Sequence, residues 1–353
     1  MHKRFLKNFF LELGTFLLLV IAVVVIFDPF YHYHGVIGNM KAVLEDRDYE
    51  VAGTLDHFDY DAVILGTSTS ENYNIDQFRD NFGTVTVKAI RASGSNADML
   101  YYLDRAYKSR SLRKVFYFLE SVSMEASLET TYAQFDTDFI TNHNLFDDIR
   151  YVLNKDVLLK KIPLQIAYSY ILPYDEGEPY AWYQSKTFSR EEILKHYYPR
   201  DDFLEMKSEK DICEEFYENA ALLEEKISQH PETEFYIVFS PVSILWWDNV
   251  YREGTIQQKM YEIAYLIELL IQYENVRMFC YQDVEEYVTD LDKYMDTVHF
   301  SNQVSREICD RVAAGDGEIH SENVEERLKT LYKMVEAFSR GGIREYYPEC
   351  TVQ

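Results

Sequence analysis

Short apolar runs alternate along this chain with longer stretches in which apolar residues return every three or four positions. This helical spacing is clear in 97–109, where Leu100, Leu103 and Tyr107 share one stripe, and again in 256–273. Alternating strands and helices predict a three-layer α/β/α sandwich of flavodoxin-like type around a five-stranded parallel sheet. Because buried parallel strands appear as continuous apolar runs, we expect strands at 61–66, 84–90, 114–120, 234–240 and 275–281.

The first thirty residues form a different pattern. Lys3, Arg4 and Lys7 precede an apolar run at 9–30, and its central part, 13–27, carries no charge. About 20 residues in a helix cross the roughly 30 Å hydrocarbon layer of a bilayer. The sequence therefore predicts one N-terminal transmembrane helix, and we interpret it as an uncleaved signal anchor. A cleaved signal peptide and a buried helix are the alternatives, but 27–34 offers no small-x-small cleavage site.

The basic residues before this helix indicate its orientation. Positive charges hold the flanking segment in the cytoplasm, so we expect a single-pass protein of the cytoplasmic membrane with its main domain outside. Phe30, Tyr31 and Tyr33 are expected to form an aromatic belt at the outer membrane interface.

The same pattern suggests how the chain is divided. We expect a cytoplasmic tip and membrane anchor at 1–34, a catalytic domain at 35–315, and a C-terminal helix and tail at 316–353. The stretch 122–232 is far longer than one crossover connection requires, so we interpret it as an insertion. An insertion that leaves the carboxyl edge of the third strand can cap a substrate site, or it can be a packing element only.

Composition excludes some classes of function. The formal net charge of -25 leaves no basic surface for phosphates, so the chain is not expected to bind nucleic acid. The four cysteines, at 213, 280, 309 and 350, lack the spacing of a zinc site. Cys280 and Cys309 could lie near one another, but buried free thiols are the favoured interpretation for them. No metal site and no cofactor are predicted.

Two short motifs carry candidate chemistry. The first apolar run ends at Gly66, and Ser68 follows it, so the predicted strand brings a hydroxyl to the carboxyl edge of the sheet. Near the other end of the chain, Asp296 precedes His299 by three residues, a spacing at which the carboxylate can orient the imidazole as a general base. A Gly-x-Ser-x-Gly nucleophile elbow is the rival interpretation, but Ser70 stands where its second glycine would be. Together the motifs predict a serine-dependent hydrolase or acyltransferase.

The motifs resemble the sequence blocks of the SGNH (GDSL-like) hydrolase superfamily. Gly66-Thr67-Ser68 resembles the first block, 92–96 (Ala-Ser-Gly-Ser-Asn) the second, and Asp296-Thr297-Val298-His299 the last. The stretches 66–72, 151–157 and 240–247 also look like a membrane-anchored branch common in Gram-positive bacteria, and the resemblance covers roughly 28–315. It implies that Ser68 is the nucleophile, that Asp296 and His299 complete a triad, and that the backbone of Gly94 donates to the oxyanion.

One departure from the family pattern concerns the oxyanion hole. The third block of the family usually supplies an asparagine after the third strand, whereas this chain has Glu120 and Ser121 there. Because an ionised carboxylate beside an oxyanion would oppose catalysis, we expect Glu120 to point elsewhere. Asn96 or Ser121 could supply the missing donor. Asn96 could instead be the N-cap of the helix that follows.

The resemblance also implies a biological setting. Relatives of this branch include the D-alanine transfer protein of teichoic-acid modification and alginate O-acetylation proteins. The expected function is therefore an extracytoplasmic esterase or O-acyltransferase that acts on an acylated cell-envelope glycan or polyol-phosphate polymer. A membrane-bound acyltransferase is a candidate partner. Two alternatives remain: a catalytically silent SGNH scaffold that binds an envelope glycan or such an acyltransferase, and a purely structural envelope protein.

Overall fold

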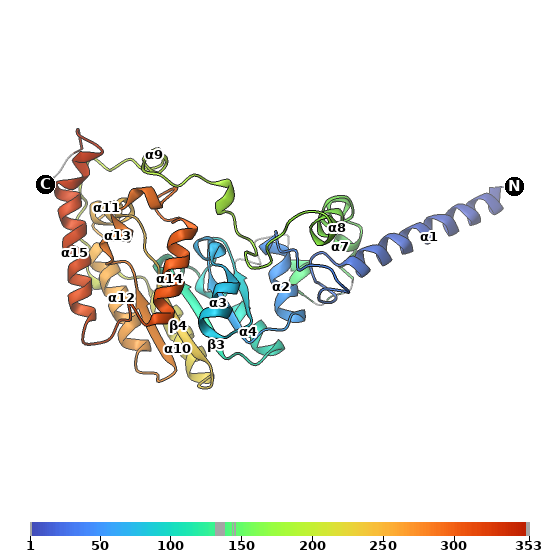
Figure 1. Ribbon diagram of the computed structural model, residues 1–353, viewed down its shortest axis with the longest axis horizontal. Coiled ribbons are helices and arrows are strands. Elements are labelled where there is room, and N and C mark those ends of the chain that lie inside the picture. Colours follow the sequence, from blue (N-terminus) through green and yellow to red (C-terminus); the bar gives the residue numbers. More distant parts are fainter. Residues whose placement is uncertain (1, 131–137, 143, 145, 351–353) are drawn as a thin grey trace.

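A five-stranded sheet lies at the centre of the computed structural model, which describes residues 2–130, 138–142, 144 and 146–350 (Figure 1). All strand pairs are parallel, and the order is β2-β1-β3-β4-β5, as in flavodoxin-like sheets. The predicted runs are confirmed as strands. Side chains on both faces of these strands are buried, as Val63 and Ile64 show, which explains why the runs are apolar. The strands are β1 (Ala62–Gly66), β2 (Thr86–Ile90), β3 (Lys114–Leu119), β4 (Glu234–Phe239) and β5 (Val276–Cys280).

Helices cover both faces of the sheet, so the predicted three-layer sandwich is confirmed (Figure 1). On one face α3 (Ile75–Phe82) packs against α14 (Asn302–Ala314). On the other, α10 (Glu214–Gln229) contacts both α4 (Asn96–Ser109) and α12 (Ile256–Leu270).

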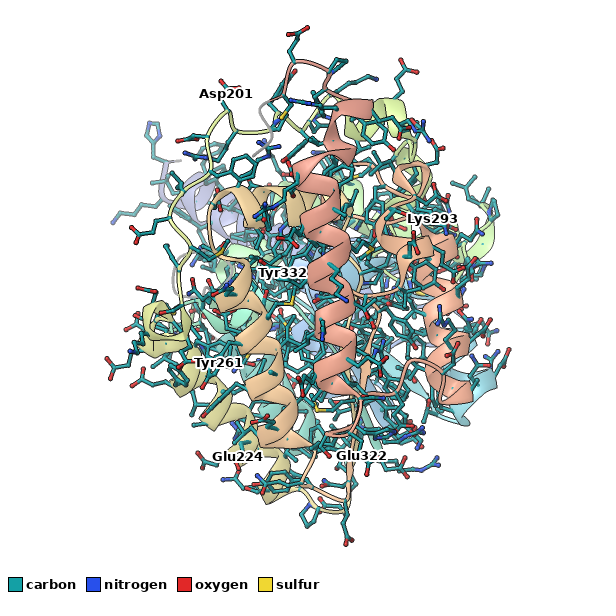
Figure 2. All side chains as sticks on the ribbon, turned by 90° about the vertical axis from the view of Figure 1, so that its left-hand side faces the viewer. Asp201, Glu224, Tyr261, Lys293, Glu322 and Tyr332 are labelled. Atoms are coloured by element: carbon teal, nitrogen blue, oxygen red, sulfur yellow. The ribbon has the colours of Figure 1, made fainter. Side chains whose placement is uncertain are left out.

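Further helices close the two edges of the sandwich. At the β2 edge, α2 (Arg47–His57) packs against β2 and α4. At the other end, α15 (Val324–Arg340) packs against α11 (Ile244–Arg252) and α12. Figure 2 looks onto α15, which carries Tyr332, and shows that α12, which carries Tyr261, lies beside it. Short elements nearby are α13 (Glu285–Val288), η6 (Leu291–Lys293) and η7 (Gly342–Glu345).

The C-terminal helix expected within 316–353 is present as α15. Its buried Leu331 and Val335 join the same apolar core as the strands. This helix therefore belongs to the main core and is not an appendage to it.

The four cysteines are free thiols. Cys280, Cys309 and Cys350 are buried, whereas Cys213 is partly exposed. The expectation that Cys280 and Cys309 are buried free thiols is therefore confirmed, whereas Cys213, at the N-cap of α10, packs against the core from a partly exposed position.

The N-terminal helix α1 (His2–Phe27) extends away from the rest of the molecule (Figure 1). Its 26 residues give a length of about 39 Å at 1.5 Å per residue, enough to cross a bilayer. It is the one helix in the described part of the chain that is long and apolar enough to do so.

A buried carboxylate fixes the end of α1 to the domain. Asp28 accepts hydrogen bonds from the backbone amides of His32, Tyr33 and His34, and from the hydroxyl of Tyr151. Such a cluster leaves little freedom between helix and domain, because each hydrogen bond to a charged group is worth about 1.5–3 kcal/mol.

The expected aromatic belt is only partly exposed. Phe30 and Tyr31 are buried, at 3% and 1% exposure, because they pack within the protein, and Tyr33 is half-buried. The prediction that Phe30 and Tyr31 form a membrane-facing belt is therefore wrong.

The insertion after β3 consists of short helices joined by irregular segments. Its first part packs on the end of α1 through a small separate core that includes Val24, Tyr151 and Val157. Its later part, before α10, contacts loops at the carboxyl edge of the sheet: the N–H of Trp182 donates to Asn72 Oδ1, and that of Ser189 donates to the carbonyl oxygen of Tyr294. The elements are α5 (Ser121–Met124), α6 (Asp138–Thr141), α7 (Ile149–Val152), the π-helical η3 (Val157–Lys161), α8 (Ile162–Tyr170), η4 (Tyr183–Ser185), α9 (Arg190–Ile193) and η5 (Glu209–Asp211).

Candidate active site

The end of β1 places Ser68 at the carboxyl edge of the sheet. The chain leaves the strand at Gly66 and turns at once into the 3₁₀ helix η1 (Ser68–Asn72). A Cβ at position 66 would lie 2.1 Å from Ser70 Oγ and 3.3 Å from the carbonyl oxygen of Phe118. Only glycine therefore permits this tight turn. As the first residue of η1, Ser68 has no intrahelical partner for its N–H.

His299 and Asp296 meet Ser68 from the loop before α14. Ser68 Oγ lies 2.8 Å from His299 Nε2, and His299 Nδ1 lies 2.8 Å from Asp296 Oδ2. Asp296 Oδ1 also accepts the backbone N–H groups of Val298 and His299, at 2.9 and 2.8 Å. The carboxylate thus fixes its own loop and the imidazole at the same time. The structure brings all three predicted triad residues together.

The charges around the imidazole favour its role as a base. Burial alone would lower the pKa of His299, but the hydrogen bond and charge of Asp296, followed by the charges of Glu120 and Glu71, raise it above the ordinary 6.5. Burial would raise the pKa of Asp296, yet its bonds from His299 and Val298 lower it below 3.8. An ionised Asp296 accepts a hydrogen bond from Nδ1–H of His299, which leaves Nε2 free to accept the proton of the Ser68 hydroxyl.

A cavity of about 540 Å³ opens over the triad, and we call it the triad cavity. Apolar side chains, including Val122 and Trp246, form part of its wall. Trp182, from the insertion, donates from Nε1 to the carbonyl oxygen of Ser68 at 3.0 Å and stands edge-on to the ring of His299. The insertion therefore contributes directly to the surroundings of the nucleophile.

Gly94 lines the triad cavity, but its backbone N–H already donates a hydrogen bond within the protein. The N–H of Gly94 donates to the carbonyl oxygen of Arg91 at 3.0 Å, closing a turn in which Ser93 has a φ of +53°. A side chain at position 94 would meet Arg91 Cβ and Met99 Cε at 2.8 Å, so the turn requires glycine. In this conformation the predicted oxyanion donor is turned to another acceptor.

Asn96 has neither of the roles considered for it. The N-cap of α4 is Ser95, which forms a capping box with Asp98, so the prediction that Asn96 is the cap is wrong. The Asn96 side chain is fully buried: Nδ2 donates to Asn219, and Oδ1 accepts from the Tyr117 hydroxyl at 3.0 Å. It points into the interface between α4, α10 and β3, and the structure does not bring it to the triad.

Glu120 lies at the site rather than away from it. It lines the triad cavity, and its Oε1 accepts hydrogen bonds from Thr67 Oγ1 at 2.5 Å and Thr69 Oγ1 at 2.7 Å. The two hydroxyls flank Ser68 in sequence, which explains how a carboxylate is accommodated there. The expectation that Glu120 points elsewhere is therefore wrong. Ser121, the other suggested donor, lines a smaller neighbouring cavity.

Several charged residues beside Ser68 were not predicted. Glu71 on η1 and Lys88 on β2 are both buried, at 1% exposure, and Arg47 pairs with Glu71. A lysine within an apolar run was the one available sequence signal, since such a residue needs buried partners.

Comparisons with known proteins leave the family open. No family model matches the chain, and no curated protein matches it. One solved structure that matches is described as "The structure of a putative platelet activating factor from Streptococcus pneumonia". It is 11% identical, with a TM-score of 0.40, over 76% of this chain and 89% of that one. At this distance the likeness says nothing about chemistry, so the function rests on the geometry of the site.

Proposed function

We propose that this protein is a membrane-anchored, SGNH-type serine esterase or O-acyltransferase. The observation that carries the proposal is the hydrogen-bonded chain from Ser68 Oγ through the imidazole of His299 to Asp296, with both distances at 2.8 Å. A hydroxyl, a base within reach and an orienting carboxylate, open to a cavity, are what acyl transfer requires.

The reaction follows from this geometry in two steps. Ser68 Oγ attacks the ester carbonyl carbon while its proton passes to His299 Nε2, and the tetrahedral intermediate collapses when that proton goes to the departing alcohol. This leaves an acyl group on Ser68. Water, or the hydroxyl of an acceptor, then attacks the acyl carbon, with His299 again taking the proton and returning it to Ser68. Water yields a carboxylic acid, and an acceptor yields a new ester.

In this mechanism the oxyanion accepts hydrogen bonds from the backbone N–H groups of Ser68 and Gly94. The Gly94 N–H must leave the carbonyl oxygen of Arg91, with which it bonds at 3.0 Å. A charged oxyanion is the stronger acceptor, since charge-assisted hydrogen bonds are roughly twice as strong as neutral ones. Substrate binding would thus complete the hole by turning one peptide group.

The proposed location is the outer face of the cytoplasmic membrane. The length of α1, the basic residues that precede its apolar part and the fixed junction at Asp28 support it. An acyl ester of an envelope glycan or polyol-phosphate polymer would be within reach of a domain held there, and a membrane-bound acyltransferase would supply or receive acyl groups.

Protease treatment of intact spheroplasts tests the orientation. The domain after residue 35 should be degraded without lysis, because it lies outside. Protection of that domain until lysis would overturn the location and with it the envelope substrate.

A silent scaffold of the same fold is the second candidate. The occupied amide of Gly94 and the carboxylate of Glu120 in the triad cavity favour it, because both oppose an oxyanion.

Labelling with a serine-directed phosphonate separates the two candidates. The wild-type protein and Ser70→Ala should be labelled, and Ser68→Ala should not. Ser70 is a matched control, since its buried Oγ has no hydrogen-bond partner among the described residues. Absence of label in all three folded proteins would leave the scaffold as the function.

A further inference from the structure

A second cavity, of about 300 Å³, adjoins Ser68 beside the triad cavity. Three segments form its wall. The first, before and within α2, contributes Leu44, Glu45 and Arg47; the second, η1, contributes Ser68 and Glu71; the third, in the insertion, contributes Glu178 and 180–182. Three of these residues are glutamates, and Arg47 is the one cation among them. We therefore call it the acidic cavity.

Glu71 lines this cavity and carries a buried acceptor that is not used. Its side chain is 1% exposed, and its Oε2 accepts from Arg47 Nη1 at 3.1 Å. Its Oε1 has no hydrogen-bond partner among the described residues. A buried acceptor without a partner costs about 1–3 kcal/mol. A ligand that donates a hydrogen bond to Oε1 would remove this cost.

Glu71 is also held firmly in place. Lys88 Nζ donates to the backbone carbonyl oxygens of Glu71, at 2.5 Å, and Pro179, at 2.7 Å, and so joins η1 to the insertion. Burial raises the pKa of Glu71 to about 7, although the charges of Arg47 and Lys88 oppose the shift. Above that pH the carboxylate is mostly ionised.

The other charges leave the cavity negative. Arg47 is committed to Glu71, and Glu178 to Arg306 and the Tyr183 hydroxyl. Glu45 forms no ion pair among the described residues; burial raises its pKa, and the charge of Lys161, which pairs with Asp46, opposes that shift. Phosphate or carboxylate groups would be repelled here, whereas hydroxyl and ammonium groups would be attracted.

We propose that the acidic cavity binds the hydrogen-bond-donating part of the substrate, a hydroxyl or an ammonium group, with Glu71 Oε1 as the acceptor. The reacting ester then lies at Ser68, between the two cavities. A further cavity of about 580 Å³ shares Glu45 and Glu178 with the acidic cavity and extends it past Tyr174. The inference rests on the proposed function and restricts the class of substrate. If the substrate is a polyol-phosphate polymer, its phosphate groups bind outside the acidic cavity.

Binding of three matched two-carbon probes tests the inference without catalysis. Ethanolamine, ethylene glycol and glycolate differ in charge at one end only. Trp182 lines the cavity, so its fluorescence reports binding at pH 8.5, and Trp182→Phe identifies its signal among the other tryptophans. Ethanolamine and ethylene glycol should bind, and glycolate should bind at least about tenfold more weakly.

The variant Glu71→Gln should weaken ethanolamine binding about tenfold, as expected for loss of a charged hydrogen-bond acceptor. Glu120→Gln makes the same change in the triad cavity and should leave this binding unchanged. If Glu71→Gln does not fold, Glu45→Gln provides the second test and should weaken ethanolamine binding several-fold. Equal binding of glycolate, or no effect of either variant in the acidic cavity, would overturn the inference.

Phosphonate labelling separates this result from the proposed function. Labelling of Ser68 without charge selection would refute the acidic-cavity assignment alone. Charge-selective binding without labelling would support the assignment and refute the esterase.

Discussion

Replacing Asp296 with asparagine should almost abolish turnover while leaving the fold intact. Asp296 Oδ1 accepts hydrogen bonds from two backbone N–H groups, and Oδ2 accepts one from Nδ1–H of His299. An asparagine that keeps Oδ1 on the two amides, worth about 1 kcal/mol each, must turn its NH₂ group toward Nδ1. The imidazole then carries its proton on Nε2, and it cannot accept the proton of Ser68.

The expected loss is about 10⁴-fold in kcat, the size seen when a triad base is held in the wrong tautomer. That factor corresponds to about 5.5 kcal/mol of transition-state stabilisation. Turnover of p-nitrophenyl acetate and thermal unfolding of the same samples measure both effects. Asp59→Asn is a matched control, since the Asp59 side chain is fully exposed. A folded Asp296→Asn protein within about tenfold of wild-type kcat would refute the reasoning.

Three further predictions concern the neighbours of the triad. Glu120→Gln removes a negative charge that raises the pKa of His299; because the base must be neutral, the rising limb of kcat/KM against pH should move to lower pH, and an unchanged limb would contradict this. Gly66→Ala places a Cβ 2.1 Å from Ser70 Oγ, and it should lower the free energy of unfolding by about 1–3 kcal/mol in urea titrations. Asn96→Ala leaves its buried partners unsatisfied; it should cost about 1–3 kcal/mol of stability and leave kcat nearly unchanged, whereas a loss of about a hundred-fold would return Asn96 to the oxyanion site.

The sheet could be predicted from the sequence because its strands are buried on both faces. Runs such as 62–65 and 235–239 are apolar at every position, as expected for central parallel strands. The triad could be predicted from the sequence for a related reason. Ser68 comes directly after such a strand, and Asp296 and His299 are close enough in sequence to pair without long-range information.

The oxyanion side of the site could not be predicted, because it depends on which group bonds to which. Nothing in the motif at 92–96 shows that the N–H of Gly94 bonds to Arg91 or that Ser95 takes the N-cap from Asn96. Likewise, the position of Glu120 depends on the hydroxyls of Thr67 and Thr69, which the family pattern does not pair with it.

The surroundings of Glu71 depend on even longer separations. Arg47, Lys88 and Trp182 come from three distant parts of the chain, and only the folded sheet edge brings them to η1. Periodicity places each element, but it does not show which charged side chains meet between elements.

Trapping the acyl-enzyme tests the central claim most directly. Wild-type protein is mixed with p-nitrophenyl acetate, quenched with acid during the first turnovers, digested and analysed by mass spectrometry. An acetyl group on Ser68, absent from Ser68→Ala, is the predicted result. Turnover that persists in Ser68→Ala, with no acetyl group on Ser68 in the wild type, would contradict the account.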